Sequence, residues 1–110
     1  LGKEGLRQTA RHCHAKAEYL KQRLTHAPAG KDAFRVLNEE PTFNEFAVRL
    51  PIPAVTVVTR MLAQGYDAGL PLAELLPGSG PNDLLIAVTE KRTRTELDAF
   101  AAALEEASWT

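Results

Sequence analysis

Apolar residues recur at helical spacing in three stretches of the chain. The first predicts a helix over 3–24 with a stripe repeating every three or four residues: Leu6, Ala10, Cys13, Ala17, Leu20 and Leu24. The second begins at Pro53, which suits the first turn of a helix, and ends at Gly65 as a C-terminal cap. The stripe expected for it is Val55, Val58, Met61 and Leu62.

The third helix is predicted to open at Thr93, because Thr93 and Glu96 have the spacing of a capping box. Its expected stripe is Leu97, Phe100, Ala101 and Leu104.

Other stretches follow the patterns of β-strands. In the run 43–50, Phe46, Val48 and Leu50 alternate with polar or small residues, as in a strand with one buried face. The run 34–37 predicts a shorter strand that forms a hairpin with it through a turn at 38–41. The apolar run 84–88 predicts a central strand. A brief strand over 66–70 and a loop over 71–83 complete the expected elements.

The resulting order is helix, two strands, helix, one or two strands, helix. It predicts one α+β domain over 1–110, with an antiparallel-rich sheet and helices packed on one face. The length suffices for a single core but is small for an enzyme with several substrates. Because the sequence has no initiator Met and starts inside a predicted helix, we expect a fragment of a longer chain.

Composition excludes several classes of function. Thirteen basic residues against 14 acidic ones give a net charge of −1, whereas a nucleic-acid binder needs a basic excess. The apolar runs are far shorter than the ~20 residues of a membrane span. A single cysteine cannot form an internal disulfide, which fits a reducing, cytoplasmic compartment.

Two local motifs invite a chemical interpretation that geometry does not support. His12, Cys13 and His14 are consecutive, and successive helix side chains point ~100° apart, so they cannot close one metal site. The Gly78-Ser79-Gly80 turn leads to a strand, not to the helix N-terminus that a phosphate loop requires. We therefore predict no metal ligands and no nucleophilic catalytic set.

Polar residues at the ends of two strands are the remaining candidates. Asn44 and Glu45 begin one strand, and Thr89, Glu90 and Arg92 follow the other. Polar side chains at strand ends often contact ligands or partners. Both sets also have a plain structural interpretation: Asn44 and Glu45 as a solvated strand face, and Glu90 with Arg92 as an ion pair beside the last helix.

The runs FNEFAVRLP (43–51) and AVTEKRT (87–93) resemble glycine dehydrogenase (decarboxylating), the P-protein of the glycine cleavage system. The opening LGKEGL and the turn GLPL at 69–72 add to the resemblance, which extends from Leu1 to about Leu104. It best matches the C-terminal end of subunit 1 of the two-subunit prokaryotic form. The family pattern has a glycine and aromatic residues where Ala73, Leu75 and Leu76 stand here.

The resemblance implies the small C-terminal domain of a fold-type-I pyridoxal-phosphate enzyme. The complete enzyme decarboxylates glycine and passes the aminomethyl group to the lipoyl arm of the H protein. The resemblance places the cofactor lysine in the second P-protein subunit, within a cytoplasmic heterotetramer. This fragment would then hold no catalytic or cofactor-binding residue and be inactive alone, covering the interdomain cleft and supporting subunit contacts.

The resemblance also places Asn44 and Glu45 near the active-site entrance or a subunit interface, and Thr89, Glu90 and Arg92 where related small domains meet the substrate carboxylate. Two alternatives remain open. One is a free-standing α+β interaction or regulatory module. The other is the small domain of a different fold-type-I enzyme, such as an aminotransferase.

Overall fold

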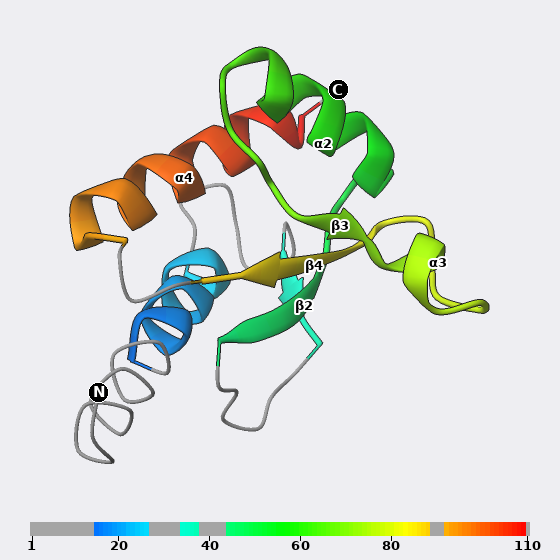
Figure 1. Ribbon diagram of the computed structural model, residues 1–110, viewed down its shortest axis with the longest axis horizontal. Helices are drawn as coiled ribbons and strands as arrows, with labels where there is room; N and C mark the ends of the chain where they lie inside the picture. Colours follow the sequence, from blue (N-terminus) through cyan, green and yellow to red (C-terminus); the bar gives the residue numbers. More distant parts are fainter. Residues whose placement is uncertain (1–14, 27–33, 38–43, 89–91, 110) are drawn as a thin grey trace, which may run out of the picture.

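The computed structural model describes residues 15–26, 34–37, 44–88 and 92–109 (Figure 1). The first helix is described over 15–25. It is followed by β1 (Arg35–Val36), β2 (Glu45–Arg49), α2 (Ala54–Ala63), β3 (Leu70–Pro71), α3 (Leu72–Leu75), β4 (Asp83–Ala87) and α4 (Arg94–Ala107). The predicted α+β class is confirmed.

The strands form one antiparallel sheet in the order β1-β2-β4-β3. The predicted β1–β2 hairpin and the central position of β4 are confirmed. Pro71 lies in the edge strand β3, where a missing N–H costs no hydrogen bond with a further strand. Because β2 and β4 run in opposite directions, β2 begins beside the end of β4.

One face of the sheet, which we call the covered face, packs against the helices. Its core residues are Phe46, Val48, Leu84 and Ile86, all at most 2% exposed. They form a single cluster with the apolar stripes of the first helix, α2 and α4. Figure 1 shows α2 and α4 lying together beside the strands. Helices on one face of the sheet are therefore confirmed.

The opposite face, which we call the open face, lies outside this core cluster. The strand register places eight side chains on it: Arg35, Glu45, Ala47, Arg49, Leu70, Asp83, Leu85 and Ala87. Ala47 and Asp83 are buried, Leu85 is half-buried, and the other five are exposed.

The predicted stripes of the first helix and α4 are confirmed where they are described. Ala17, Leu20 and Leu24 are at most 1% exposed, and Leu97, Ala101 and Leu104 are buried, with Phe100 packed beside them. Leu6, Ala10 and Cys13, like the expected turn at 38–41, fall outside the described residues.

The predicted stripe of α2 was partly wrong. The helix buries Ala54, Val57 and Met61, whereas Val55 is 51% exposed and Leu62 is 67% exposed. The sequence of α2 is apolar on nearly every side, so two neighbouring stripes compete and periodicity alone cannot choose between them.

A further expectation was wrong. The loop expected over 71–83 contains the last residue of β3 and the short helix α3, which buries none of its residues and so gives no periodic signal. In the first helix, Lys21 is only 6% exposed, and its Nζ lies 2.9 Å from Oε2 of Glu18.

Gly65 ends α2 as predicted. Its φ of 87° is the left-handed conformation that glycine adopts without strain. Its N–H donates to the carbonyl of Leu62, and the N–H of Tyr66 donates to that of Met61, both at 2.9 Å. These two bonds form a Schellman motif. The turn aims the chain from α2 towards the start of α4.

Candidate functional site

A pocket with a volume of about 310 Å³ opens where β4 ends and α4 begins. Four segments line it: the first helix, the turn after α2, the end of β4 and the first turns of α4. Its apolar wall consists of Leu20, Ile86, Val88, Leu97 and Phe100. Arg92, Glu96, Asp67 and the tyrosine Tyr66 add polar groups. The pocket thus combines apolar side chains with polar groups, and ligand sites in proteins also combine the two.

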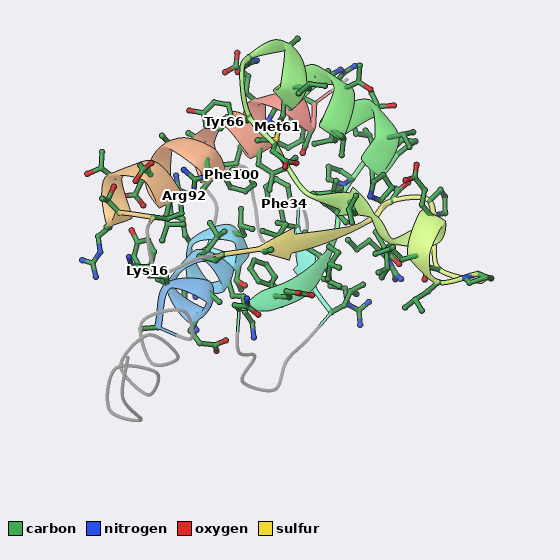
Figure 2. All side chains as sticks on the ribbon, viewed as in Figure 1. Lys16, Phe34, Met61, Tyr66, Arg92 and Phe100 are labelled. Atoms are coloured by element: carbon green, nitrogen blue, oxygen red, sulfur yellow. The ribbon has the colours of Figure 1, made fainter. Side chains whose placement is uncertain are left out.

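Two aromatic rings from different elements pack together in the pocket wall. Tyr66 follows α2 and Phe100 lies in α4, and their ring centroids are 6.3 Å apart at an interplanar angle of 71°. This edge-to-face contact is a favourable arrangement for aromatic rings. Figure 2 shows Tyr66 and Phe100 close together, with Arg92 nearer the beginning of α4. The contact fixes the turn after α2 against α4.

Arg92 is exposed at the pocket and is held only loosely. Its Nη1 donates to Oε2 of Glu96 at 3.3 Å, and the two side chains are 62% and 49% exposed. An exposed ion pair of this length contributes little to stability. The guanidinium therefore can exchange Glu96 for another carboxylate at low cost. The alternative expected from the sequence, an ion pair of Arg92 with Glu90, stays a prediction because Glu90 lies outside the described residues; the described partner of Arg92 is Glu96.

The start of α4 is closed by the capping box that the sequence predicted. The N–H of Glu96 donates to Oγ1 of Thr93 at 3.1 Å, and the N–H of Thr93 donates to Oε1 of Glu96 at 3.0 Å. The Thr93 N–H, then the Thr93 hydroxyl, and more weakly Arg92, lower the pKa of Glu96 from its ordinary value. The carboxylate thus stays charged and keeps the Thr93 N–H occupied, while the Thr93 hydroxyl oxygen occupies the N–H of Glu96.

Of the predicted candidates, the structure describes Asn44, Glu45 and Arg92 and does not bring these three into one site. The carbonyl of Asn44 accepts a 2.7 Å bond from the N–H of Val88, so Asn44 lies at the same end of the sheet as the pocket without lining it. Glu45 lies on the open face, opposite Ala87. Thr89 and Glu90 fall outside the described residues.

The described residues do not fit a pyridoxal phosphate site. Of the described lysines, Lys21 is buried against Glu18 in the first helix, away from the pocket lining, and Lys16 is also absent from that lining. At the start of α4 the capping box already uses the N–H groups of Thr93 and Glu96, and Asp67 and Glu96 place carboxylates in the same pocket as Arg92. Those negative charges oppose binding of a phosphate dianion.

The described part of the chain has neither a metal-binding cluster nor a membrane-spanning helix. Over residues 15–26, 34–37, 44–88 and 92–109, no three His, Cys, Asp or Glu side chains are arranged to hold a metal ion. Among the same residues, no helix has both the length and the apolar character needed to cross a membrane.

The sequence did not predict two sets of polar residues: a pair that lines the pocket, and an ion pair across two strands. Tyr66 and Asp67 reach the pocket from the turn after α2, and their only signal was that they follow the capping Gly65. The second is the ion pair of Arg49 with Asp83, in which Nε lies 2.8 Å from Oδ1 and Nη2 lies 3.3 Å from Oδ2. Hydrogen bonding from Arg49 lowers the pKa of the Asp83 carboxyl, which is 3% exposed.

Comparisons with known proteins agree on one family, although no family model matches the chain. It is 44% identical over 104 residues to "Probable glycine dehydrogenase (decarboxylating) subunit 1" of Chlorobium limicola, covering 94% of this chain and 22% of that protein. It is 47% identical over 107 residues to the protein of the same name from Geotalea uraniireducens, covering 97% and 23%. The chain therefore spans less than a quarter of the length of these curated relatives.

The fold has solved counterparts. A crystal structure of glycine decarboxylase (P-protein) of the glycine cleavage system, in inhibitor-bound form, matches 97% of this chain and 23% of that one, with a TM-score of 0.81 and 32% identity. A NifS-like protein matches 94% of the chain and 29% of its own, with a TM-score of 0.70 but 18% identity, so it supports the fold alone. The chain is a homologue of one segment of glycine dehydrogenase (decarboxylating) subunit 1, with the fold of a small fold-type-I domain.

Proposed function

We propose that this chain is the C-terminal domain of subunit 1 of a two-subunit glycine dehydrogenase (decarboxylating). The assembled enzyme would decarboxylate glycine and pass the aminomethyl group to the lipoyl arm of the H protein in the cytoplasm. Pyridoxal phosphate, when bound, supplies an electron sink for that chemistry. In this proposal a lysine of the second subunit holds the cofactor, and this domain covers the interdomain cleft and supports subunit contacts.

The observation that carries the proposal is identity of 40–47% to subunit 1 proteins along at least 94% of the chain. No separate observation favours an aminotransferase or a free-standing module, since the similarity to the NifS-like protein concerns the fold alone.

Arg92 is the residue of this domain best suited to contact a carboxylate. It is 62% exposed, it lies in the pocket lining, and its bond to Glu96 is long and solvated. A guanidinium can bind a carboxylate through two parallel hydrogen bonds. Asn44 lies at the same end of the sheet, next to Val88 of the pocket. The proposal assigns Arg92 and Asn44 to the active-site entrance or the subunit interface.

A chimeric enzyme tests the assignment. This chain replaces the matching segment of the Chlorobium limicola subunit, and the chimera is combined with a second subunit and an H protein. We expect glycine-dependent release of carbon dioxide by the unaltered chimera. Asn44→Ala and Arg92→Ala should each lower this rate by about tenfold or more, because a charge-assisted contact at a desolvated site contributes ~2 kcal/mol or more.

Glu106→Ala is the matched control, because Glu106 is exposed near the far end of α4. It should leave the rate unchanged. Thermal melting separates structure from function, since surface truncations usually change stability by no more than ~0.5 kcal/mol. If Asn44→Ala and Arg92→Ala melt several degrees lower while the assembled enzyme keeps full activity, these residues are structural and the assignment is wrong.

A further inference from the structure

Tyr19, in the first helix, holds the first turn of α4 through two contacts. Its hydroxyl donates to Oδ1 of Asp98 at 2.5 Å, and Cζ of Arg94 lies over its ring, 4.7 Å from the centroid. Arg94 and Asp98 have i,i+4 spacing, so they lie on the same side of α4. One side chain therefore contacts both ends of the turn that opens the helix. Figure 1 shows the first helix, in blue, beside the beginning of α4, in orange.

The same turn of α4 determines where Arg92 lies. The helix begins at Arg94, and the capping box of Thr93 and Glu96 closes its start. Arg92 stands just before this box, and its Nη1 lies 3.3 Å from Oε2 of Glu96. Because Glu96 lies between Arg94 and Asp98 along the helix, a shift of the first turn would carry the carboxylate with it and move the guanidinium of Arg92.

Tyr19 also joins two walls of the pocket. Leu20 follows it in the first helix, Leu97 precedes Asp98 in α4, and both leucines line the pocket and are at most 4% exposed. Tyr19 is half-buried against the core, so packing fixes its ring. Hydrogen bonding to Asp98 raises the pKa of Tyr19, so the phenol remains a donor at neutral pH. A hydrogen bond to a carboxylate is stronger than one to a neutral acceptor.

A second contact joins the same two helices farther from the pocket. Nη1 of Arg23 donates to Oε1 of Glu105 at 2.7 Å. Glu105 lies about two helical turns beyond Asp98, away from the start of α4. Nε of Arg23 also lies 3.9 Å from Oδ1 of Asp98, so Glu105 is the residue that separates the two contacts. A change at Glu105 therefore weakens the packing of the helices without touching the first turn of α4.

We propose that Tyr19 is a positioning residue for Arg92: it fixes the first turn of α4 so that the guanidinium lies where a carboxylate can meet it. This inference rests on the proposed function, in which Arg92 lies at the active-site entrance or the subunit interface. Tyr19 is not among the residues that line the pocket, so its effect on the reaction is exerted through Arg92. Displacing a positioned group by about 1 Å can cost a large factor in rate.

Hydrogen exchange in the chimera described above tests the first step without any substrate. Tyr19→Phe keeps the ring and removes the hydroxyl, and Glu105→Gln is the matched control. Exchange followed by mass spectrometry should quicken about fivefold in peptides covering 93–98 for Tyr19→Phe and by less than about twofold for Glu105→Gln. Unchanged exchange in Tyr19→Phe, or equal acceleration in both variants, would overturn the proposal.

A double-mutant cycle tests whether Tyr19 acts through Arg92. The measured quantity is kcat/KM for glycine in the assembled chimera, with the H protein saturating. Tyr19→Phe should lower it about fivefold when Arg92 is present and less than about twofold in an Arg92→Ala background, because the group to be positioned is then absent. Glu105→Gln should leave it unchanged. A merely structural role of Tyr19 predicts the same loss in both backgrounds, and that result would overturn the proposal.

Variants of Asp98 test the hydrogen bond itself. Asp98→Ala should reproduce the loss seen in Tyr19→Phe, and the combined variant should be no worse than either one, since both remove the same bond. Asp98→Glu keeps a carboxylate and should recover most of the rate. Losses that multiply in the combined variant would show that the bond between Tyr19 and Asp98 does not carry the effect.

Failure of the inference is distinguishable from failure of the proposed function. If Arg92→Ala lowers the rate and Tyr19→Phe does not, only the positioning role is overturned. If Arg92→Ala keeps full activity, the assignment of Arg92 is wrong and the positioning role falls with it. If the unaltered chimera is inactive, the proposed function is contradicted, and the exchange comparison still decides whether Tyr19 holds the first turn of α4.

Discussion

The two faces of the sheet share their backbone hydrogen bonds but differ in what their side chains meet. On the covered face, Phe46, Val48 and Leu84 are at most 1% exposed, inside one core cluster with three helices. On the open face, the apolar row of Ala47, Leu85 and Leu70 lies outside that cluster. The domain therefore builds its core cluster on one face, while the apolar row of the other face is buried only in part, with Ala47 buried, Leu85 half-buried and Leu70 exposed.

The largest expected effect is on stability, and it should differ between two neighbouring leucines that lie on opposite faces. Leu84 is fully buried and Leu85 is half-buried, and they are adjacent in β4. Leu84→Ala should lower the free energy of unfolding by about 3 kcal/mol, because it leaves a cavity in the core. Leu85→Ala should cost about 1 kcal/mol or less in the 110-residue chain. Urea unfolding followed by circular dichroism measures both, and equal losses would remove the distinction between the faces.

The next effect on stability concerns the contact between α2 and α4, the helices that pack on the covered face. Nη1 of Arg60 donates to the carbonyls of Ala107 and Trp109, at 3.0 and 2.5 Å. The last turn of α4 has no basic residue of its own, so Arg60 satisfies carbonyls at the negative end of its dipole. Arg60→Met should destabilise the chain by about 1.5 kcal/mol. Arg60→Lys should recover part of that loss, and a neutral Arg60→Met would mean that solvent satisfies these carbonyls equally well.

A pH dependence should arise on the open face. Because Arg49 lowers the pKa of Asp83 in the folded state, the contribution of Asp83 is complete above its unfolded pKa near ~3.9 and is lost as pH falls through the lower folded value. The stability difference between the unaltered chain and Asp83→Asn should be about 1 kcal/mol at pH 7 and should shrink below about pH 4.

Urea midpoints across the acid range measure this difference. Glu106→Gln is the control, because its side chain makes no ion pair with the described residues, and its difference should stay flat. A difference for Asp83→Asn that is constant down to pH 2 would mean that the ion pair with Arg49 does not stabilise the fold.

The smallest expected effect has the opposite sign. Arg35→Gln removes one of two arginines paired across β1 and β2, so it should stabilise the 110-residue chain by ~0.5 kcal/mol at low salt. Added salt should abolish the gain, because it screens exposed charges. Parallel melts in 20 mM and 500 mM sodium chloride test this prediction. A salt-independent change would indicate that packing of Arg35, and not its charge, matters.

The sequence predicted elements well where apolar and polar residues contrast clearly. The stripes of the first helix and α4, the alternation of β2 and the cap at Gly65 were each readable because one face of the element is polar or because only glycine suits the turn. The phase of α2 was not readable, because Val55 and Leu62 are as apolar as the residues that it buries.

The candidate site was less predictable, because it depends on register and on tertiary packing. Arg49 meets Asp83 only because β2 and β4 pair in one register, which the sequence does not specify. Tyr66 reaches the pocket because the turn after α2 directs it towards Phe100. Arg92 was proposed from its position after a strand, but its bond to Glu96 follows from helical i,i+4 geometry.

Gly69 sets a limit on how this domain can vary. Its φ is 129°, and a Cβ at this position would collide with the carbonyl oxygen of Leu85 in the neighbouring strand. The segment that follows β3 is more tolerant, since α3 buries no residue. A saturation-mutagenesis map should therefore show an intolerant Gly69 shortly before a permissive exposed stretch. Such a position, invisible to hydropathy, would serve as a marker when distant members of the family are aligned through this region.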